Sequence, residues 1–69
     1  MSACIYIRFN CPACERVASA VRENNLDANL INVQLEKSGI PRIQIFPALY
    51  IDGELKAFGD DILQILKKY

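Results

Sequence analysis

The sequence predicts a small α/β fold, a mixed four-stranded sheet with helices packed on it, formed by a single domain over residues 1–69. Three features predict this class. A strand–helix–strand pattern fills the first half of the chain, a two-residue turn signal joins two short strands in the second half, and an amphipathic segment ends it. With 52% hydrophobic residues, the chain has enough apolar side chains for a core.

The first half reads as two parallel strands joined by a helix. The nearly continuous apolar run Ala3–Phe9 predicts a central strand. Pro12 suits the first turn of a helix. Apolar residues at spacings of three and four predict that this helix continues to Asn24. These apolar residues are Cys14, Val17, Ala18 and Val21. Alternating side chains from Ile31 predict a second strand over Asn29–Glu36, parallel to the first.

The second half reads as a loop, a hairpin and a helix. Lys37–Gln44 contains glycine and proline, which favours a loop with room for one short helical turn. Asp52-Gly53 is typical of a hairpin between a strand over Ala48–Asp52 and an edge strand over Glu54–Phe58. A last helix, Asp60–Tyr69, is expected to be capped by Asp60 or Asp61, with an apolar stripe of Ile62, Ile65, Leu66 and Tyr69. We expect the helices on the two faces of the sheet.

Charge and composition exclude several function classes. Eight basic and eight acidic residues leave no net charge, which argues against binding to nucleic acid or to an anionic membrane surface. No stretch approaches the roughly 20 apolar residues of a membrane span, and no leader pattern is seen, so a cytoplasmic monomer is expected. The absence of histidine excludes catalytic triads with histidine and histidine-ligated metal sites.

The segment Cys11-Pro12-Ala13-Cys14 carries the chemistry, because it lies where a central strand passes into a helix. Unpaired N–H groups and the helix dipole stabilise an anion there, which lowers a thiol pKa. A two-residue spacer on a helical turn, stiffened by Pro12, brings Cys14 within reach of the Cys11 sulfur. Cys11 would attack a substrate disulfide, and Cys14 would resolve the mixed disulfide that forms.

Metal binding is the alternative interpretation of the cysteine pair. Only Cys4 remains as a further thiol, so four ligands cannot be assembled without a carboxylate, and no metal site is expected. A small copper chaperone of the ferredoxin-like type also places such a pair between its first strand and first helix. That fold ends in a strand, whereas this sequence predicts a final helix. We expect Cys4 to be a buried strand residue that packs as a small hydrophobe.

Proline 47 precedes the third strand, where a proline is either a trans residue at strand entry or a cis residue with a functional role. Together with the dithiol it gives the sequence a resemblance to the glutaredoxins of the thioredoxin-fold superfamily over most of the chain. The matching segments are Arg8 before the dithiol, Cys11-Pro12-Ala13-Cys14, Phe46-Pro47, Tyr50-Ile51-Asp52-Gly53 and Gly59-Asp60-Asp61. The family usually has lysine at the first of these, Cys-Pro-Tyr-Cys at the second and Val-Pro at the third.

The resemblance implies a shortened, minimal thioredoxin fold (βαββα) and a disulfide-reducing enzyme. The segment before Pro47 is too short for the family's middle helix, so one sheet face would be poorly covered. Pro47 would be cis and pack against the dithiol, the Phe46 backbone would pair with substrate, and Arg8 and Asp61 would hold the charged ends of glutathione. Substrate contacts would come from Arg8, Pro12, Ala13, Phe46, Pro47, Gly59, Asp60 and Asp61.

The same resemblance implies the partners. Glutathione would be a co-substrate rather than a tightly bound cofactor, and the substrate would be a disulfide-bearing protein or a glutathione mixed disulfide. Ala13 stands where the family has tyrosine, and Ala57-Phe58 where it has two glycines. A close alternative is the glutaredoxin-like group that reduces ribonucleotide reductase and takes electrons from thioredoxin reductase.

Overall fold

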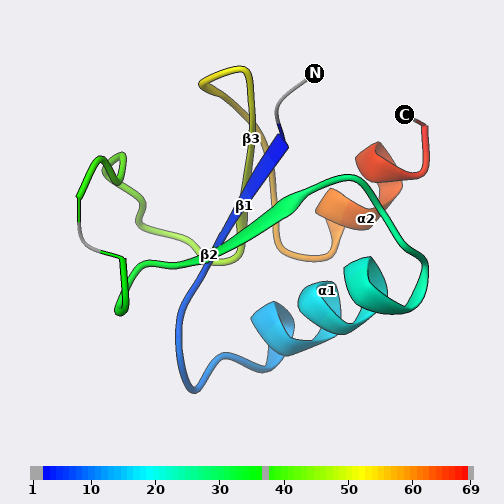
Figure 1. Cartoon of the computed structure of the whole chain (residues 1–69), viewed down its shortest axis with the longest axis horizontal. Helices are drawn as coiled ribbons and strands as arrows, with labels where there is room; N and C mark the ends of the chain where they lie inside the picture. The colour runs from blue at the N-terminus through cyan, green and yellow to red at the C-terminus, as the bar shows by residue number, and fades with distance from the viewer. Residues whose placement is uncertain (1–2, 37, 69) are drawn as a thin grey trace.

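The structure is a computed structural model that describes residues 3–36 and 38–68. The chain forms β1 (Ala3–Ile7), α1 (Pro12–Glu23), β2 (Asn29–Asn32), β3 (Ala48–Ile51), β4 (Glu54–Phe58) and α2 (Asp61–Leu66), as Figure 1 shows. The four strands make one sheet in the order β2-β1-β3-β4. β1 runs parallel to β2 and antiparallel to β3, so the predicted mixed sheet with a central first strand is confirmed.

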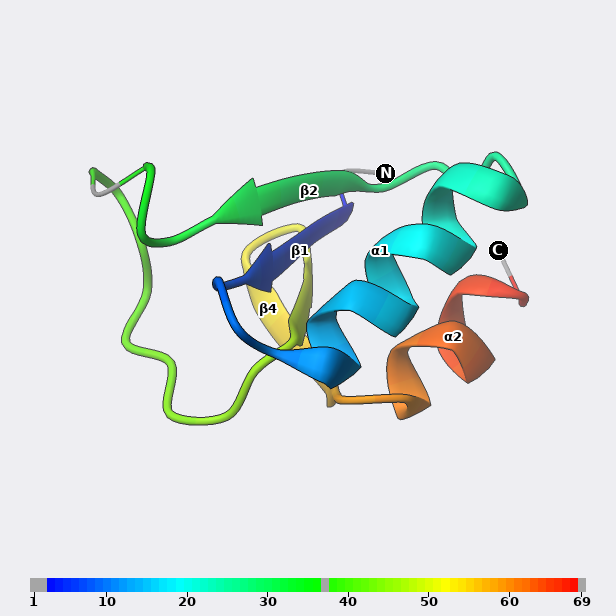
Figure 2. The same cartoon turned by 90° about the horizontal axis from the view of Figure 1, so that it is seen from below.

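Both helices lie on the same face of the sheet, and the expectation that they cover the two faces is wrong. Figure 2 shows α1 and α2 side by side below the strands, and the two helices contact each other. Their apolar side chains meet those of β1, β3 and β4 in one cluster built around Ile5, Val17, Leu49 and Ile62. A chain of 69 residues buries too little surface for two cores, so the helices share one.

Among the described residues no helix covers the opposite face of the sheet, in line with the poorly covered face that the resemblance implied. Cys4 and Tyr6 of β1 and Tyr50 of β3 point to this face and are half-buried, so the expectation of a buried Cys4 is wrong. The two tyrosine rings meet edge to face, with centroids 5.4 Å apart. Residues 39–41 of the loop overhang these side chains and leave a cavity of about 320 Å³ between loop and sheet.

The junction between β1 and α1 is shorter than predicted on the strand side. β1 ends at Ile7 rather than Phe9, and Asn10 then adopts a left-handed conformation with φ 56°. Helix α1 begins at Pro12 and ends at Glu23, within one residue of the prediction. Its buried residues are those of the predicted apolar stripe: Cys14, Val17, Ala18 and Val21.

Strand β2 stops at Asn32, so the predicted strand to Glu36 is too long. The side-chain oxygen of Asn32 accepts a hydrogen bond from the backbone N–H of Gln34 at 2.9 Å. The backbone carbonyl of Asn32 accepts hydrogen bonds from the N–H groups of Leu35 and Glu36. Such an asparagine turn satisfies the backbone locally and competes with strand pairing. The alternation of apolar residues after Ile31 therefore belongs to a turn.

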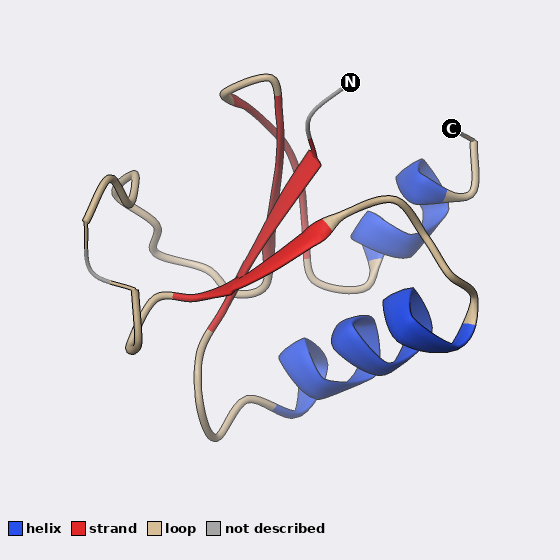
Figure 3. Ribbon diagram, viewed as in Figure 1, coloured by secondary structure: helices blue, strands red, loops and turns tan. Residues whose placement is uncertain are grey.

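The long connection from β2 to β3 contains neither helix nor strand in its described residues (Figure 3). The hairpin between β3 and β4 turns at Asp52 and Gly53, which have φ 52° and 81°. Two successive left-handed residues are what the tightest hairpin turns require, so the predicted turn is confirmed. β4 lies at the edge of the sheet, as expected.

Helix α2 is shorter than predicted and ends at Leu66; Tyr69, which was assigned to its apolar stripe, lies outside the described residues. Asp60 occupies the N-cap position, one of the two positions predicted for the cap, and Asp61 lies in the first turn; the Asp60 side chain makes no capping hydrogen bond. In the split βαβ unit of the ferredoxin-like alternative, another strand lies between the first two strands, whereas β1 and β2 are paired directly in this sheet. Neither described helix has the length and apolarity to cross a bilayer.

Candidate dithiol site

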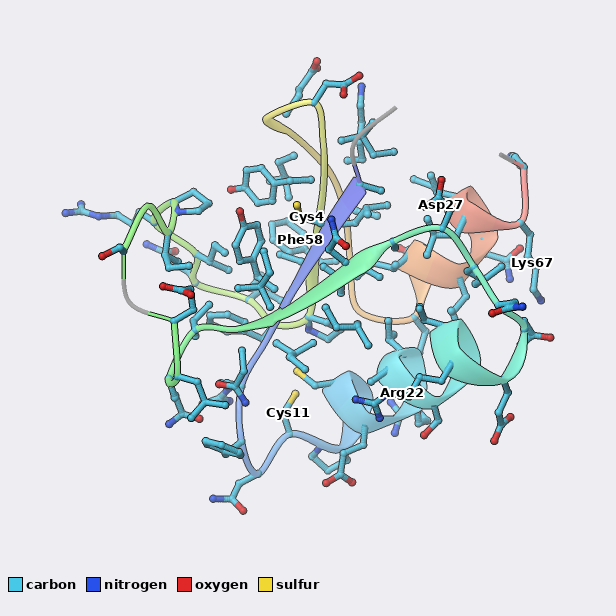
Figure 4. All side chains as sticks on the ribbon, viewed as in Figure 1. Cys4, Cys11, Arg22, Asp27, Phe58 and Lys67 are labelled. Carbon is cyan, nitrogen blue, oxygen red and sulfur yellow. The ribbon has the colours of Figure 1, made fainter. Side chains whose placement is uncertain are left out.

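The cysteine pair lies at the start of α1, at the end of the connection from the central strand. Figure 4 shows Cys11 there and Cys4 well away from it on the body of β1. Cys11 is the N-cap residue of the helix, with an extended backbone at φ −130° and ψ 100°. Both thiols are buried, at 6% and 1% exposure for Cys11 and Cys14, and neither is in a disulfide, so the structure is that of the reduced dithiol.

The helix start holds the Cys11 sulfur by a backbone hydrogen bond. The N–H of Cys14 donates to Cys11 Sγ at 3.2 Å, and the N–H of Glu15 donates to the Cys11 carbonyl at 3.0 Å. The sulfur thus takes the place of a capping oxygen, at the positive end of the helix. Pro12 occupies the first helical position, where its missing N–H leaves no backbone partner unsatisfied.

The two thiols have pKa values displaced in opposite directions. Burial works to raise the pKa of Cys11, but the thiol and backbone N–H of Cys14 and the Arg8 guanidinium outweigh it and lower that pKa below its ordinary value of 9.0. Burial and the hydrogen bond to Cys11 raise the pKa of Cys14 to about 11. Cys11 is therefore the thiol that ionises first, and Cys14 keeps its proton.

Arginine 8 reaches the dithiol from the segment that follows β1. Its guanidinium carbon lies 5.7 Å from the centre of the Phe46 ring. The register of β1 against β3 pairs Tyr6 with Ala48, and its continuation by two residues sets Arg8 opposite Phe46. The structure therefore brings together two residues that the resemblance assigned to substrate binding, and it does so through a contact that sequence reasoning missed.

The Phe46–Pro47 peptide bond is cis, as the resemblance implied. Pro47 is fully buried, and its carbonyl accepts a hydrogen bond from the N–H of Gly59 at 2.9 Å. This hydrogen bond connects the segment before β3 to the turn between β4 and α2. The paired register of β1 and β3 ends at Ala48, so Phe46 lies beyond the sheet ladder.

The acidic pair before α2 is only partly brought into the site. Asp60 forms a bidentate ion pair with Arg16 of α1. Arg16 Nε donates to Asp60 Oδ1 at 3.4 Å, and Arg16 Nη2 donates to Asp60 Oδ2 at 3.3 Å. This ion pair was not foreseen; Arg16 lies on the exposed side of a predicted helix, which gives no signal about its partner. Asp61 is exposed, and no hydrogen bond or ion pair among the described residues joins it to the dithiol.

A groove of about 420 Å³, lined by both apolar and polar side chains, runs along the Cys14 side of α1. Arg8, Asn10, Glu15 and Arg22 line it, and Cys14 borders it. Glu15 is the carboxylate of this groove, and there is no buried carboxylate among the described residues. Nor do these residues contain a group of three or more cysteine, aspartate or glutamate side chains that could hold a metal ion. Ala13, between the cysteines, is half-buried.

The chain has a thioredoxin-like fold, with two helices against a mixed four-stranded sheet, and a Cys-x-x-Cys pair at the start of the first helix. Comparison with solved structures gives the same result. The crystal structure of the thioredoxin-like protein BC3987 matches with a TM-score of 0.71 and 25% identity, over 94% of this chain and 99% of that one. A mutant of that protein matches with a TM-score of 0.72 and 25% identity, over 96% and 99%. No protein-family model and no curated protein matches the sequence.

Proposed function

We propose that the protein is a thiol–disulfide oxidoreductase that reduces disulfides, with Cys11 as the nucleophile and Cys14 as the resolving thiol. The observation that carries the proposal is the opposite displacement of the two pKa values within one helical turn. A thiolate is the nucleophile in disulfide exchange, and the lower pKa assigns that role to Cys11.

The reaction takes place in two exchanges. The Cys11 thiolate attacks one sulfur of the substrate disulfide; the substrate S–S bond breaks, and the other sulfur leaves as a thiolate that takes a proton from water. Cys14 then loses its proton to water in the adjoining groove and attacks Cys11 Sγ. The mixed disulfide breaks, the second substrate thiol leaves, and two electrons have passed from the dithiol to the substrate.

The high pKa of Cys14 suits the resolving role. A thiol that stays protonated does not compete for the incoming disulfide, and the N–H of Cys14 on the Cys11 sulfur supports the charge that Cys11 carries. Once Cys11 is bonded to substrate it no longer holds that charge, so the part of the Cys14 pKa shift that Cys11 causes is removed. Resolution therefore follows attack in the order that the chemistry needs.

Glutathione, or a reductase of the thioredoxin type, would return the oxidised pair to the dithiol. The Arg8 guanidinium beside Cys11 supports a glutathione contact. Asp60 is already paired with Arg16, which leaves Asp61 as the freer carboxylate for the amino end of glutathione. The proposed substrates are a protein disulfide, such as that of a ribonucleotide reductase, or a glutathione mixed disulfide.

The test is a reductase assay on three cysteine variants, run in parallel with glutathione and with thioredoxin reductase. Cys11→Ser abolishes reduction of an insulin or mixed-disulfide substrate, because no thiolate attacks. Cys14→Ser retains the first attack and accumulates a covalent mixed disulfide, which intact-protein mass spectrometry detects. Cys4→Ser is the matched control. Because Cys4 lies on the other face of the sheet, this variant is expected to keep full activity.

Full activity of the Cys11 variant would refute the mechanism. Asp61→Ala separates the two electron donors. It weakens the glutathione-coupled rate if glutathione is held as proposed, and an unchanged rate identifies the reductase as the donor.

A further inference from the structure

The Arg8–Phe46 contact links the segment before α1 to the segment before β3. The 5.7 Å distance from the guanidinium carbon to the ring centre lies within the range at which an aromatic face attracts a cation. Arg8 is exposed, and an exposed arginine ordinarily samples many rotamers. Phe46 is half-buried and precedes Pro47, which is fully buried and hydrogen-bonded to Gly59. The ring is therefore the fixed partner of the pair.

No carboxylate neutralises the Arg8 charge within the part of the chain that the structure describes. Asp60 and Glu54 are paired with other cations, Arg16 and Lys56 respectively. The other charged side chains on the groove that Arg8 lines are Glu15 and Arg22. The Arg8 side chain favours the Cys11 thiolate, and Arg8 and Cys14 line the same groove beside the dithiol. Its effect on Cys11 depends on where the guanidinium is held, and the guanidinium lies over the Phe46 ring.

We infer that Phe46 is a positioning residue for the thiolate chemistry: its ring holds the Arg8 guanidinium beside the Cys11 sulfur. The inference rests on the proposed function for its importance, but the contact itself can be tested without turnover. In this role the ring acts through Arg8, and the role is distinct from the pairing of the Phe46 backbone with substrate. A side chain without a ring at position 46 leaves Arg8 free to extend into water.

The expected effect is on the ionisation of Cys11. Arg8 favours the thiolate, so its displacement lowers the fraction of Cys11 that is ionised at neutral pH and raises the midpoint of the ionisation curve. An exposed cation–π contact corresponds to about a two- to fivefold change in an equilibrium constant, which sets the largest change expected in the Cys11 ionisation constant. The rate of Cys11 alkylation at neutral pH falls in the same direction.

The experiment is a double-mutant cycle on the full chain, with the pH profile of Cys11 alkylation by iodoacetamide as the readout. Phe46→Leu removes the ring and keeps an apolar side chain and the backbone; Arg8→Met removes the charge and keeps the length of the side chain. Phe46→Trp is the conservative variant. With Arg8 present, Phe46→Leu shifts the pH profile of alkylation to higher pH. In the Arg8→Met background, Phe46→Leu leaves the profile unchanged. Phe46→Trp has the same profile as the parent protein.

Two results would overturn the inference: no shift with Phe46→Leu, or an equal shift with and without Arg8. The second result means that the ring acts through burial and not through Arg8. If the leucine variant does not fold, Phe46→Met takes its place in the cycle, because methionine is also apolar and without a ring and adapts its shape to the site. A protein that shows the coupling but reduces no disulfide would refute the proposed function and leave this inference intact.

Discussion

Selective alkylation of Cys11 at neutral pH is the sharpest consequence of the site geometry. The pKa of Cys14 is about 11, so about 1 in 10,000 of its thiols is ionised at pH 7. The pKa of Cys11 lies below 9.0, so more than about 1 in 100 is ionised there. Ionisation alone favours Cys11 by at least about a hundredfold.

Part of this advantage is lost because a thiolate of higher pKa is the better nucleophile. With a Brønsted slope of about 0.4–0.5 and a difference of roughly two pKa units, the Cys14 thiolate is intrinsically about eightfold more reactive than the Cys11 thiolate. The net preference for Cys11 is therefore at least about tenfold. Accessibility acts in the same direction, because Cys11 is 6% exposed and Cys14 is 1% exposed.

The assay is a short pulse of iodoacetamide on the reduced protein, followed by mass spectrometry of the two cysteine sites. As pH rises, the Cys11 rate increases with a midpoint below pH 9.0, whereas the Cys14 rate keeps increasing toward its pKa of about 11. In denaturing urea the preference disappears, because both thiols lose their tertiary contacts. Equal or faster labelling of Cys14 in the folded protein would refute the assignment of roles.

Two further predictions concern the scaffold. Ile62→Ala removes a fully buried side chain that joins α2 to the core, and we expect a loss of about 2–5 kcal/mol in the free energy of unfolding, measured by urea denaturation. A domain of this size has only about 3–10 kcal/mol in total, so a loss under 1 kcal/mol would mean that α2 is not part of the cooperative unit. Gly53→Ala places a side chain at φ 81° in the hairpin turn. We expect it to lower the free energy of unfolding by about 1–2 kcal/mol, again measured by urea denaturation. An unchanged free energy of unfolding would show that the turn can change type without strain.

Local features of the fold could be predicted from the sequence because their causes are local. The apolar stripe of α1 and the Asp52-Gly53 turn depend on residues only a few positions apart, and both are confirmed. Strand β2 shows the limit of this reasoning. Its apolar alternation continues past Asn32, and an asparagine side chain that satisfies the backbone ends the strand earlier. A pattern of hydrophobic side chains does not register a competing hydrogen bond.

The placement of the helices could not be predicted, for a different reason. An amphipathic pattern indicates that one side of a helix is buried, but not which face of the sheet it meets. Only the shared cluster of Val17 on α1 and Ile62 on α2 shows that a single core serves both.

The sequence by itself determined the dithiol, its position at a strand–helix junction and the helix start that favours an anion on Cys11. These follow from the order of residues along the chain and from the polarity of a helix. Only the tertiary structure decided how the two thiols differ. Burial keeps Cys14 protonated, and the Arg8 charge favours the Cys11 thiolate. Arg8 in turn lies over the ring of Phe46, which belongs to a distant segment of the chain. Burial and charge act through space, and a linear sequence does not state which side chains the fold brings near a sulfur atom.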